Sequence, residues 1–383
     1  MNKAFDYSEI APYQDHEVNK VLDELKSNTS FLHLLKFMKL DTSPDAVDRF
    51  LAGITSVDEF QLRVSKPWLH QLFYHTTTGI IHKGIDTLPG TEKYLFISNH
   101  RDIALDSAIL NVLFSDHDIQ TVETAIGDNL LKFEIVKTLA KLNKNFKVKR
   151  SGSAREMYRH SLTLSSYIRK RITEQESSIW IAQREGRAKD GNDKTQQGVI
   201  KMLNLSNENG FEAGCKALNI RPISMSYEYD PCDRFKVKEL LARETNDIYE
   251  KEEGEDFNNV IAGFLGHKGR VNLSISPVLD CEIDQLEGIK NINEKINELA
   301  KMIDLAIYQG YQLFPNNYIA HDILQKTCQW HQFYSRDEKQ AFTDYANNVC
   351  RNLPPRAKEI FFQKYAYPLI NKNREARSEK TDG

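Results

Sequence analysis

The chain has 383 residues, of which 40% are hydrophobic and 27% are charged, and its formal net charge is −3. This composition is ordinary for a globular protein with a sizeable core, and it gives no global field that would favour nucleic acid. The five cysteines form no CxxC pair, which argues against a disulfide framework or a zinc site and fits a reducing cytosol. The sequence shows neither a signal-peptide core nor an apolar run of about 18 residues, so we expect no membrane-spanning helix.

Residues 1–75 are expected to form a helical N-terminal region. Apolar residues recur at helical spacing from residue 17 to residue 38. A further helix is predicted at SPDAVDRFLAGI, with Ser43 as the N-cap and Pro44 at the first helical position. The simplest interpretation of this region is a scaffold or lid that carries no chemistry.

From about residue 76 the pattern changes to short apolar runs that alternate with helical segments. This alternation predicts an α/β fold with a central, mostly parallel or mixed sheet flanked by helices. The α/β domain is expected over residues 76–285, followed by a helical C-terminal region over 286–383 that ends in a frayed, charged tail. The predicted strands are KYLFISNH (93–100), FKVKRSG (146–152), SSIWIAQREGR (177–187), ALNIRPISMSYEYD (217–230) and RVNLSISPVL (270–279).

The stretch NHRDIALD contains the letters HRD, with which the catalytic loop of a protein kinase begins. Such a loop needs an asparagine five residues after the aspartate to hold magnesium, but Ser107 stands five residues after Asp102. The sequence also contains no DFG and no upstream GxGxxG loop. A kinase is therefore excluded.

His100 and Asp106 offer a second interpretation of the same stretch. His100 ends a predicted strand, and Asp106 lies about one helical turn into the next element. A carboxylate that accepts the Nδ1 hydrogen of an imidazole leaves Nε2 free to take a proton from an alcohol. Asp102 competes with Asp106 for this orienting role. An isolated His–Asp pair is more often structural than catalytic, so the pair alone does not decide the function.

A basic cluster follows further along the chain. Its five cations stand within ten residues, just before SGS, which opens a predicted helix with a capping box of Ser153 and Glu156. At a strand end beside His100, Arg150 and the helix N-terminal amides would make a phosphate site. The alternative is a solvated charged face. The cations are Lys141, Lys144, Lys147, Lys149 and Arg150.

Four segments taken together give the sequence a family resemblance. NHRDIALD, FKVKR, WIAQREGR and IRPISMSYE occur in this order between residues 90 and 230. The series resembles the four ordered blocks of the glycerol-3-phosphate and 1-acyl-glycerol-3-phosphate acyltransferases. The chain looks like a divergent branch, because Asp106 follows His100 by six residues instead of five. In addition, Arg187 follows Gly186 directly, where the family usually has one residue between.

The resemblance implies an O-acyltransferase of phospholipid biosynthesis. His100, oriented by Asp106, would act as a general base that forms no acyl-enzyme intermediate, with acyl-CoA or acyl-carrier protein as co-substrate and no metal or other cofactor. The acceptor would be glycerol-3-phosphate or a lysophospholipid. Substrate-binding residues would be Lys149, Arg150, Glu185, Gly186 and Arg187, and Pro222, Ile223 and Met225 would line an acyl pocket.

The same resemblance implies work at a lipid surface. We expect a cytoplasmic protein that attaches peripherally to the inner face of the membrane and binds no nucleic acid. Residues 66–75 and 360–370 are candidate membrane contacts, although packing between regions explains them equally well. Two other functions remain open, namely acylation of a non-phosphoglyceride lysolipid and non-catalytic binding of a lipid or anion. The sequence leaves the acceptor, the donor, the chain length and the oligomeric state undecided.

Overall fold

The structure is a computed structural model, and it describes residues 5–245, 249 and 254–378. Its centre is a seven-stranded sheet in the order β1-β7-β6-β2-β5-β3-β4. Only the β6–β7 pair is antiparallel among the strands described, so β1 and β7 run opposite to the other five. The strands are β1 (Thr77–Lys83), β2 (Leu95–Ser98), β3 (Glu123–Gly127), β4 (Asn145–Val148), β5 (Ile179–Ala182), β6 (Ile220–Tyr227) and β7 (Gly269–Ile275).

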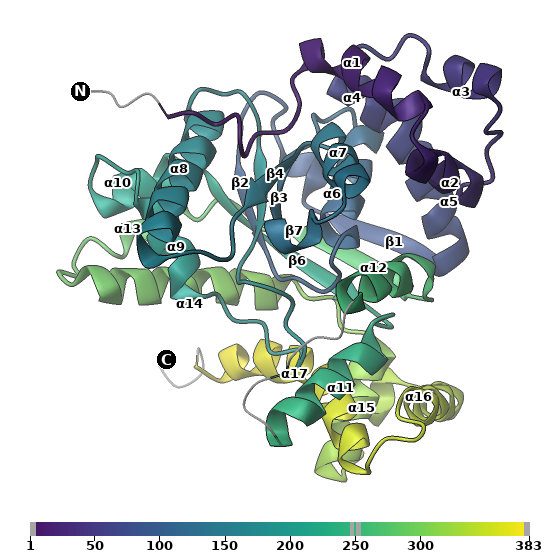
Figure 1. Cartoon of the computed structure of the whole chain (residues 1–383). Helices are drawn as coiled ribbons and strands as arrows, with labels where there is room; N and C mark the ends of the chain where they lie inside the picture. The colour runs from purple at the N-terminus through teal and green to yellow at the C-terminus, as the bar shows by residue number, and fades with distance from the viewer. Residues whose placement is uncertain (1–4, 246–248, 250–253, 379–383) are drawn as a thin grey trace.

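Helices cover both faces of this sheet (Figure 1). The face packed by α8 (Ala154–Thr173), α9 (Gln197–Asn204), α10 (Phe211–Lys216), α13 (Asp280–Asp284) and α14 (Ile292–Gly310) forms the larger core cluster. The opposite face packs against α5 (Lys66–Thr76) and α6 (Leu105–Asp116). The remaining helices of this part are α7 (Glu134–Leu142), α12 (Glu255–Leu265) and the short turns η2 (Ile85–Thr87) and η3 (Asp128–Leu130).

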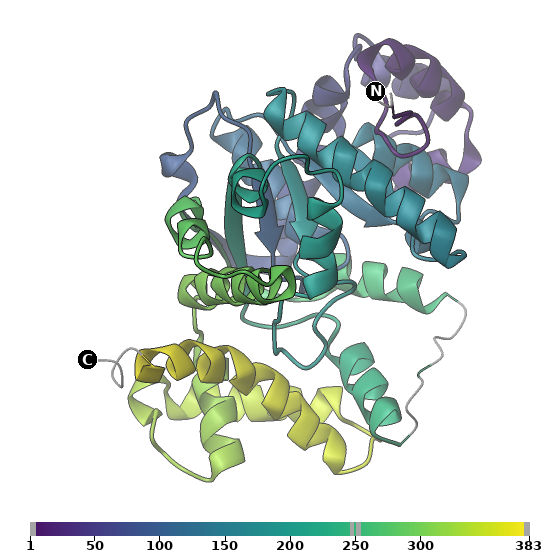
Figure 2. The same ribbon diagram turned by 90° about the vertical axis from the view of Figure 1, so that its left-hand side faces the viewer.

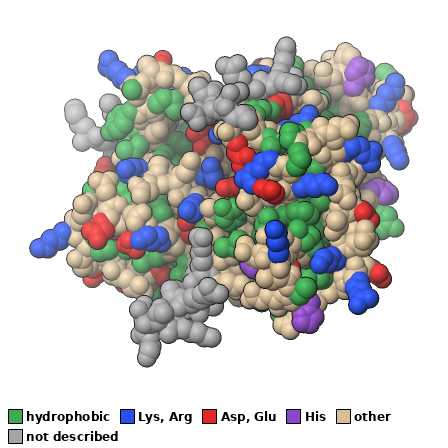
Figure 3. Space-filling model, turned by 90° about the horizontal axis from the view of Figure 1, so that it is seen from below, with side chains coloured by type: hydrophobic (Ala, Val, Ile, Leu, Met, Phe, Trp, Pro, Cys, Tyr) green, Lys and Arg blue, Asp and Glu red, His purple; other side chains and the backbone are tan. Residues whose placement is uncertain are grey.

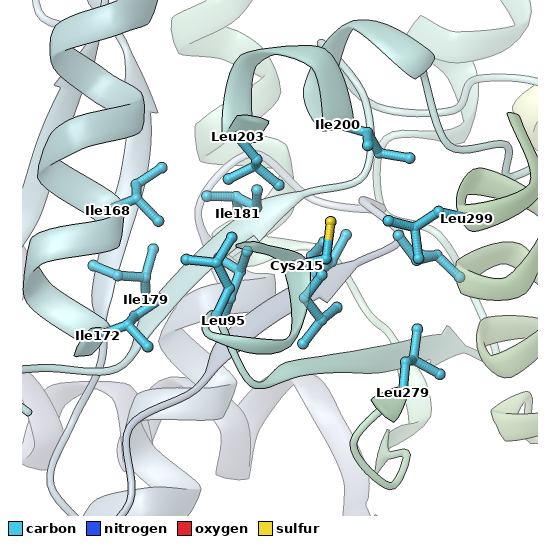
Figure 4. Close-up of a cluster of buried hydrophobic side chains, with 14 of the residues drawn as sticks. Leu95, Ile168, Ile172, Ile179, Ile181, Ile200, Leu203, Cys215, Leu279 and Leu299 are labelled. Atoms are coloured by element: carbon cyan, nitrogen blue, oxygen red, sulfur yellow. The ribbon is translucent and has the colours of Figure 1, made fainter. Parts of the chain in front are cut away.

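The central strand β2 shows why the sheet forms here. All four of its residues are buried, and alternate side chains point to opposite faces. Leu95 packs with Ile168 of α8, Ile179 of β5 and Leu203 of α9, as Figure 4 shows. Phe96 belongs to the core cluster on the other face. A strand buried on both faces reads as a continuous apolar run, which is the signal seen in the sequence.

The N-terminal helices form a separate apolar cluster that includes Val18, Leu35 and Phe60. Ser43 and Pro44 take the predicted N-cap and first helical positions of the third helix. A π-helical segment joins this group to α5. The elements are α1 (Asp15–Lys26), α2 (Thr29–Phe37), α3 (Pro44–Leu51), α4 (Val57–Phe60) and η1 (Gln61–Ser65).

A second helical group lies below the sheet in Figures 1 and 2. Its apolar cluster includes Val237, Ile319, Phe342 and Phe361. Its outer face, seen in Figure 3, mixes hydrophobic side chains with acidic and basic ones. The elements are α11 (Asp233–Thr245), α15 (Pro315–Gln325), η4 (His331–Phe333), α16 (Arg336–Val349) and α17 (Arg356–Ser378). We refer to these elements as the C-terminal bundle.

The expected fold class is confirmed, since a mixed sheet flanked by helices carries helical additions at both ends. The five predicted strands correspond to β2, β4, β5, β6 and β7, whereas β1 and β3 were not predicted. Packing crosses the expected boundary at residue 286, because α11 packs in the C-terminal bundle and α14 packs on the sheet. In the described part of the chain, no helix has the length and apolar character needed to cross a membrane.

Candidate active site

The loop after β2 is fixed to the neighbouring strand by the side chain of Asn99. Its Nδ2 donates to the carbonyl oxygen of Met225 at 3.0 Å, and its Oδ1 accepts the Met225 amide at 2.7 Å. Asn99 thus continues the pairing of β2 with β6 by one residue beyond the end of the strand. The next residue, His100, therefore leaves the sheet from a rigid point.

His100 and Asp106 are brought together as the sequence predicted. His100 Nδ1 lies 2.8 Å from Asp106 Oδ2. The same oxygen accepts the backbone amides of Arg101 and Asp102, at 2.7 and 3.1 Å, and Oδ1 accepts the Tyr227 hydroxyl at 2.9 Å. Because the carboxylate can only accept, Nδ1 carries the hydrogen and Nε2 presents a lone pair. Asp106 is therefore a fixed support for the imidazole.

Asp102 stabilises the turn after His100, whereas the sequence made it a candidate for orienting the imidazole. Its Oδ1 accepts the amides of Ala104 and Leu105, at 3.0 and 2.9 Å, and so closes the turn that leads into α6. Burial, together with the nearby Asp106 carboxylate, raises the pKa of Asp102. In this geometry Asp106 orients His100, and the turn that Asp102 stabilises takes up the longer spacing between His100 and Asp106.

His100 lies on the wall of a cavity of about 2180 Å³. Its side chain is 13% exposed, and its ring meets the edge of Trp180 at a centroid distance of 5.7 Å. The lining is largely apolar, and its aromatic members come from the N-terminal helices, α5, the segment before α7, β4, β5 and α12. They are Phe31, Phe37, Phe60, Trp68, Phe133, Phe146, Trp180, Phe257 and Phe264.

Three members of the basic cluster line this cavity, and two of them, Lys149 and Arg150, are weakly paired. Lys149 Nζ lies 3.1 Å from His160 Nε2, and Arg150 Nε lies 3.9 Å from Glu185 Oε1. The Arg150 guanidinium packs directly over Gly127, where a Cβ atom would meet it at 2.4 Å. A glycine at the end of β3 thus makes room for the guanidinium.

The other three cations of the cluster have partners of their own. Lys147 also borders the cavity, but its ammonium pairs with Glu9 at 2.8 Å. Lys144 is buried and pairs with Asp58, while Lys141 lies over the ring of Tyr13. The cluster is therefore partly structural, and only Lys149 and Arg150 combine a place on the cavity wall with weak pairing.

The backbone amides at the start of α8, which were expected to bind a phosphate, are partly occupied by a side chain of the protein. The capping box at the start of α8 forms as predicted, with the Glu156 carboxylate accepting the Ser153 amide at 2.9 Å. This contact places a negative charge at the N-terminus of α8, beside the proposed phosphate position. Side-chain cations, more than these amides, would have to bind an anion here.

The segment around Glu185 is divided between the cavity and the protein interior. Glu185 and Gly186 line the cavity, and Gly186 has a positive φ of +68° that turns the chain. Arg187 is buried instead, donates to Asn259 Oδ1 at 3.0 Å, and does not line the cavity. Arg184 lines the cavity in its place. No pattern in the sequence distinguishes the arginine on the cavity wall from the buried one.

The candidate acyl-pocket residues lie elsewhere in the structure. Pro222, Ile223 and Met225 are buried in β6, and the latter two belong to the core between the sheet and α6. None of the three lines the cavity. Part of the apolar lining comes from the N-terminal helices, which the sequence analysis assigned to scaffold, and the aromatic residues of α2 were the available signal.

Comparisons with known proteins place part of the chain near one family. Residues 79–205 match the family model described as Acyltransferase. The fold is similar to the crystal structure of the 1-acyl-sn-glycerophosphate acyltransferase PlsC from Thermotoga maritima, with 12% sequence identity and a TM-score of 0.36 over 75% of this chain and 95% of that chain. No curated protein matches the sequence. The chain is therefore similar to the Acyltransferase family over residues 79–205.

Proposed function

We propose that the protein transfers a fatty acyl group from an acyl thioester, either acyl-CoA or acyl-carrier protein, to a hydroxyl of glycerol-3-phosphate or a lysophospholipid. One observation carries this proposal: His100, held by Asp106, faces a large apolar cavity that Lys149 and Arg150 also line. Small-molecule pockets usually measure about 300–1,000 Å³. A cavity of about 2180 Å³ has room for a long acyl chain together with an acceptor.

In the proposed reaction His100 is the general base. The acceptor hydroxyl gives its proton to Nε2 as its oxygen attacks the thioester carbonyl carbon. The C–O bond forms, the C–S bond breaks, and the departing thiolate takes the proton from Nε2. Asp106 stabilises the imidazolium between these two transfers, and general-base help of this kind supplies about 10² to 10⁴ in rate. No acyl-enzyme intermediate is required.

Lys149 and Arg150 would hold the phosphate of the acceptor. Arg150 offers a planar fork of donors that matches a phosphate, and its weak contact with Glu185 leaves these donors available. Glu185 would release Arg150 as the phosphate binds, and Gly186 allows the chain to turn at the edge of the cavity. Arg187, being buried, would support this segment from beneath.

The cavity rim suggests how a lipid substrate reaches the site. Four apolar residues on the lining are strongly exposed, and Phe133 and Phe257 are 63% and 56% exposed. The others are Phe37 and Leu62. Exposed lysines flank Phe37 and Phe133 in the sequence, namely Lys36 and Lys132. Aromatic residues beside cations are typical of a surface that enters the interfacial region of an anionic bilayer. We propose peripheral attachment through this rim to the inner face of the membrane.

A thiol-release assay tests the proposed reaction. Acyl-CoA and acyl-carrier protein are each combined with glycerol-3-phosphate, its 1-acyl derivative and a lysolipid without a phosphoglycerol group. We expect free thiol and acylated product for at least one phosphate-bearing acceptor, and neither with His100→Ala. Substrate binding without thiol release in all combinations would identify a non-catalytic binder instead.

A flotation assay tests the attachment. Phe37→Asp with Phe133→Asp should reduce co-flotation with vesicles that contain anionic lipid. Phe333→Asp is a matched control, because Phe333 is also exposed but lies on η4 and does not line the cavity. Equal flotation of both variants would show that the rim is not the membrane contact.

A further inference from the structure

The residues on either side of His100 share one buried carboxylate. Arg101 Nη2 lies 2.6 Å from Asp193 Oδ2, and Asn99 Nδ2 donates to the same oxygen at 3.1 Å. The Tyr311 hydroxyl adds a third hydrogen bond at 2.5 Å. Asp193 is fully buried. The arginine of the HRD sequence therefore points into the protein and anchors the loop.

The backbone next to His100 is held by a lysine from the C-terminal bundle. Lys236, on α11, donates from Nζ to the carbonyl oxygen of Arg101 at 2.7 Å and pairs with Asp230 at 2.5 Å. Lys364, on α17, pairs with Asp230 at 2.8 Å and also with Asp233. A continuous chain of charges thus runs from α17 through Asp230 to the His100 loop.

This ionic chain is wholly buried and electrically balanced. Lys236 and Lys364 are 1% and 4% exposed, and the two aspartates are buried as well. Burial alone would raise the pKa of Asp230, but the two ammonium groups hold it well below its usual range. Two cations and two anions cancel, so this ionic chain carries no net charge.

Stability does not explain why such a chain is present. Taking charges out of water is expensive, and apolar residues of the same volume often give equal or greater stability. What charged groups supply in addition is fixed geometry, because each hydrogen bond defines a distance and a direction. The end of this ionic chain is the peptide between Arg101 and Asp102, directly after His100 in the loop, where fixed geometry matters most to the proposed reaction.

We propose that Lys236 is a positioning residue for His100, and that Lys364 acts through it, so that the C-terminal bundle is part of the acyltransferase centre. Lys236 holds the Arg101 carbonyl, and this contact sets the direction in which the imidazole leaves the loop. Lys364 fixes Asp230 and hence the Lys236 ammonium. This inference rests on the proposed function wherever it is tested by kcat.

Lys236→Met and Lys238→Met form a matched pair on α11, because Lys238 is exposed two residues further on. A misplacement of about 1 Å costs on the order of 100-fold in rate. We expect kcat of Lys236→Met to fall by roughly that factor, with KM changed less than about threefold. Lys364→Met keeps the bond to Arg101 and should lose roughly tenfold. Lys238→Met should match the parent protein.

A readout of His100 itself separates positioning from a general loss of structure. The ¹H–¹³C signal of the His100 ring is identified by its absence in His100→Gln and followed from pH 5 to pH 8. In folded Lys236→Met, confirmed by circular dichroism, we expect a shifted signal or a shifted titration midpoint. An unchanged signal overturns the proposal, whether or not kcat has fallen.

The same measurement keeps the two proposals apart. If the parent protein releases no thiol with any substrate pair, the proposed function fails, and the His100 signal alone decides on positioning. If Lys236→Met does not fold, the comparison is made between Lys364→Met and Lys358→Met, an exposed lysine on α17. Unchanged kcat and an unchanged His100 signal in Lys364→Met would then overturn the proposal.

Discussion

Two groups of cations, one on the cavity wall and one against the His100 loop, differ in how fully they are paired. Arg150 is 33% exposed, and its guanidinium Nε lies 3.9 Å from Glu185 Oε1 on the wall of the cavity. Lys236 is 1% exposed and lies 2.5 Å from Asp230. A weakly paired cation retains capacity for a ligand, whereas a saturated one fixes the structure around it. The cations on the cavity wall therefore suggest substrate binding, and the buried cations suggest positioning of the His100 loop.

The largest effect is expected at His100, which lines the cavity and is followed by the residue that Lys236 binds. His100→Ala removes the proposed base and should reduce turnover by about 10² to 10⁴. The fold should remain, because the ring projects to the cavity wall. Thiol release and thermal unfolding are the two measurements. Turnover near that of the parent protein would refute the base mechanism.

The second prediction compares the two aspartates of the loop. Asp106→Asn keeps an oxygen that accepts the amides of Arg101 and Asp102, but loses the charge that stabilises the imidazolium. We expect kcat to fall by about 100-fold, the lower end of what general-base help supplies. Asp102→Asn keeps the capping oxygen of the turn and removes a buried charge, so kcat and stability should stay near those of the parent protein. If Asp102→Asn had the larger effect on kcat, the assignment of Asp106 would be wrong.

The third prediction tests the weakly paired cations. Arg150→Ala should raise KM for a phosphate-bearing acceptor by about 10- to 100-fold, since a hydrogen bond to a charged group contributes about 1.5–3 kcal/mol. Lys147→Ala is the control from the same basic cluster, because its ammonium is already paired with Glu9. Initial rates against acceptor concentration give both values. Equal KM values in the two variants would place the phosphate elsewhere.

The smallest effect on turnover is expected at a further buried lysine, Lys268, whose ammonium donates to the carbonyl oxygens of Phe264 and Gly266. Burial lowers its pKa from 10.5 to about 8. Between these values the unfolded chain holds more protons than the folded one, so folding stability should rise with pH. Relative to Lys268→Met, the free energy of unfolding should increase by roughly 3 kcal/mol at most between pH 7 and 10.5. Urea unfolding at several pH values measures this, and parallel curves would contradict it.

The sequence predicted the strands with strong apolar runs and missed two that lack them. β3 contains Glu123 and Gly127, and Glu123 is buried only because Arg171 and Tyr167, both from α8, bond to it. β1 lies at the edge of the sheet and alternates in exposure around Gly79. Tertiary partners stabilise both strands, and no local pattern reveals such partners.

Within the site, residues joined by a short turn were predictable and distant ones were not. His100 and Asp106 are six residues apart, so their contact follows from one strand and one helical turn. Arg187 follows the turn at Gly186, and only the completed packing against Asn259 decides that it points inward. Lys236 and Lys364 lie on helices outside the family resemblance. The sequence there does not distinguish a buried lysine from an exposed one.

The hydrogen bond from Tyr227 to Asp106 has a consequence for how the protein can be divided. The family match ends at residue 205, yet Met225 and Tyr227 on β6 fix Asn99 and Asp106. A fragment cut at the limits of the match would contain His100 without these supports. During synthesis the chain emerges from its N-terminus, so His100 is made long before them. The geometry of the site is therefore acquired late, after β6 has entered the sheet.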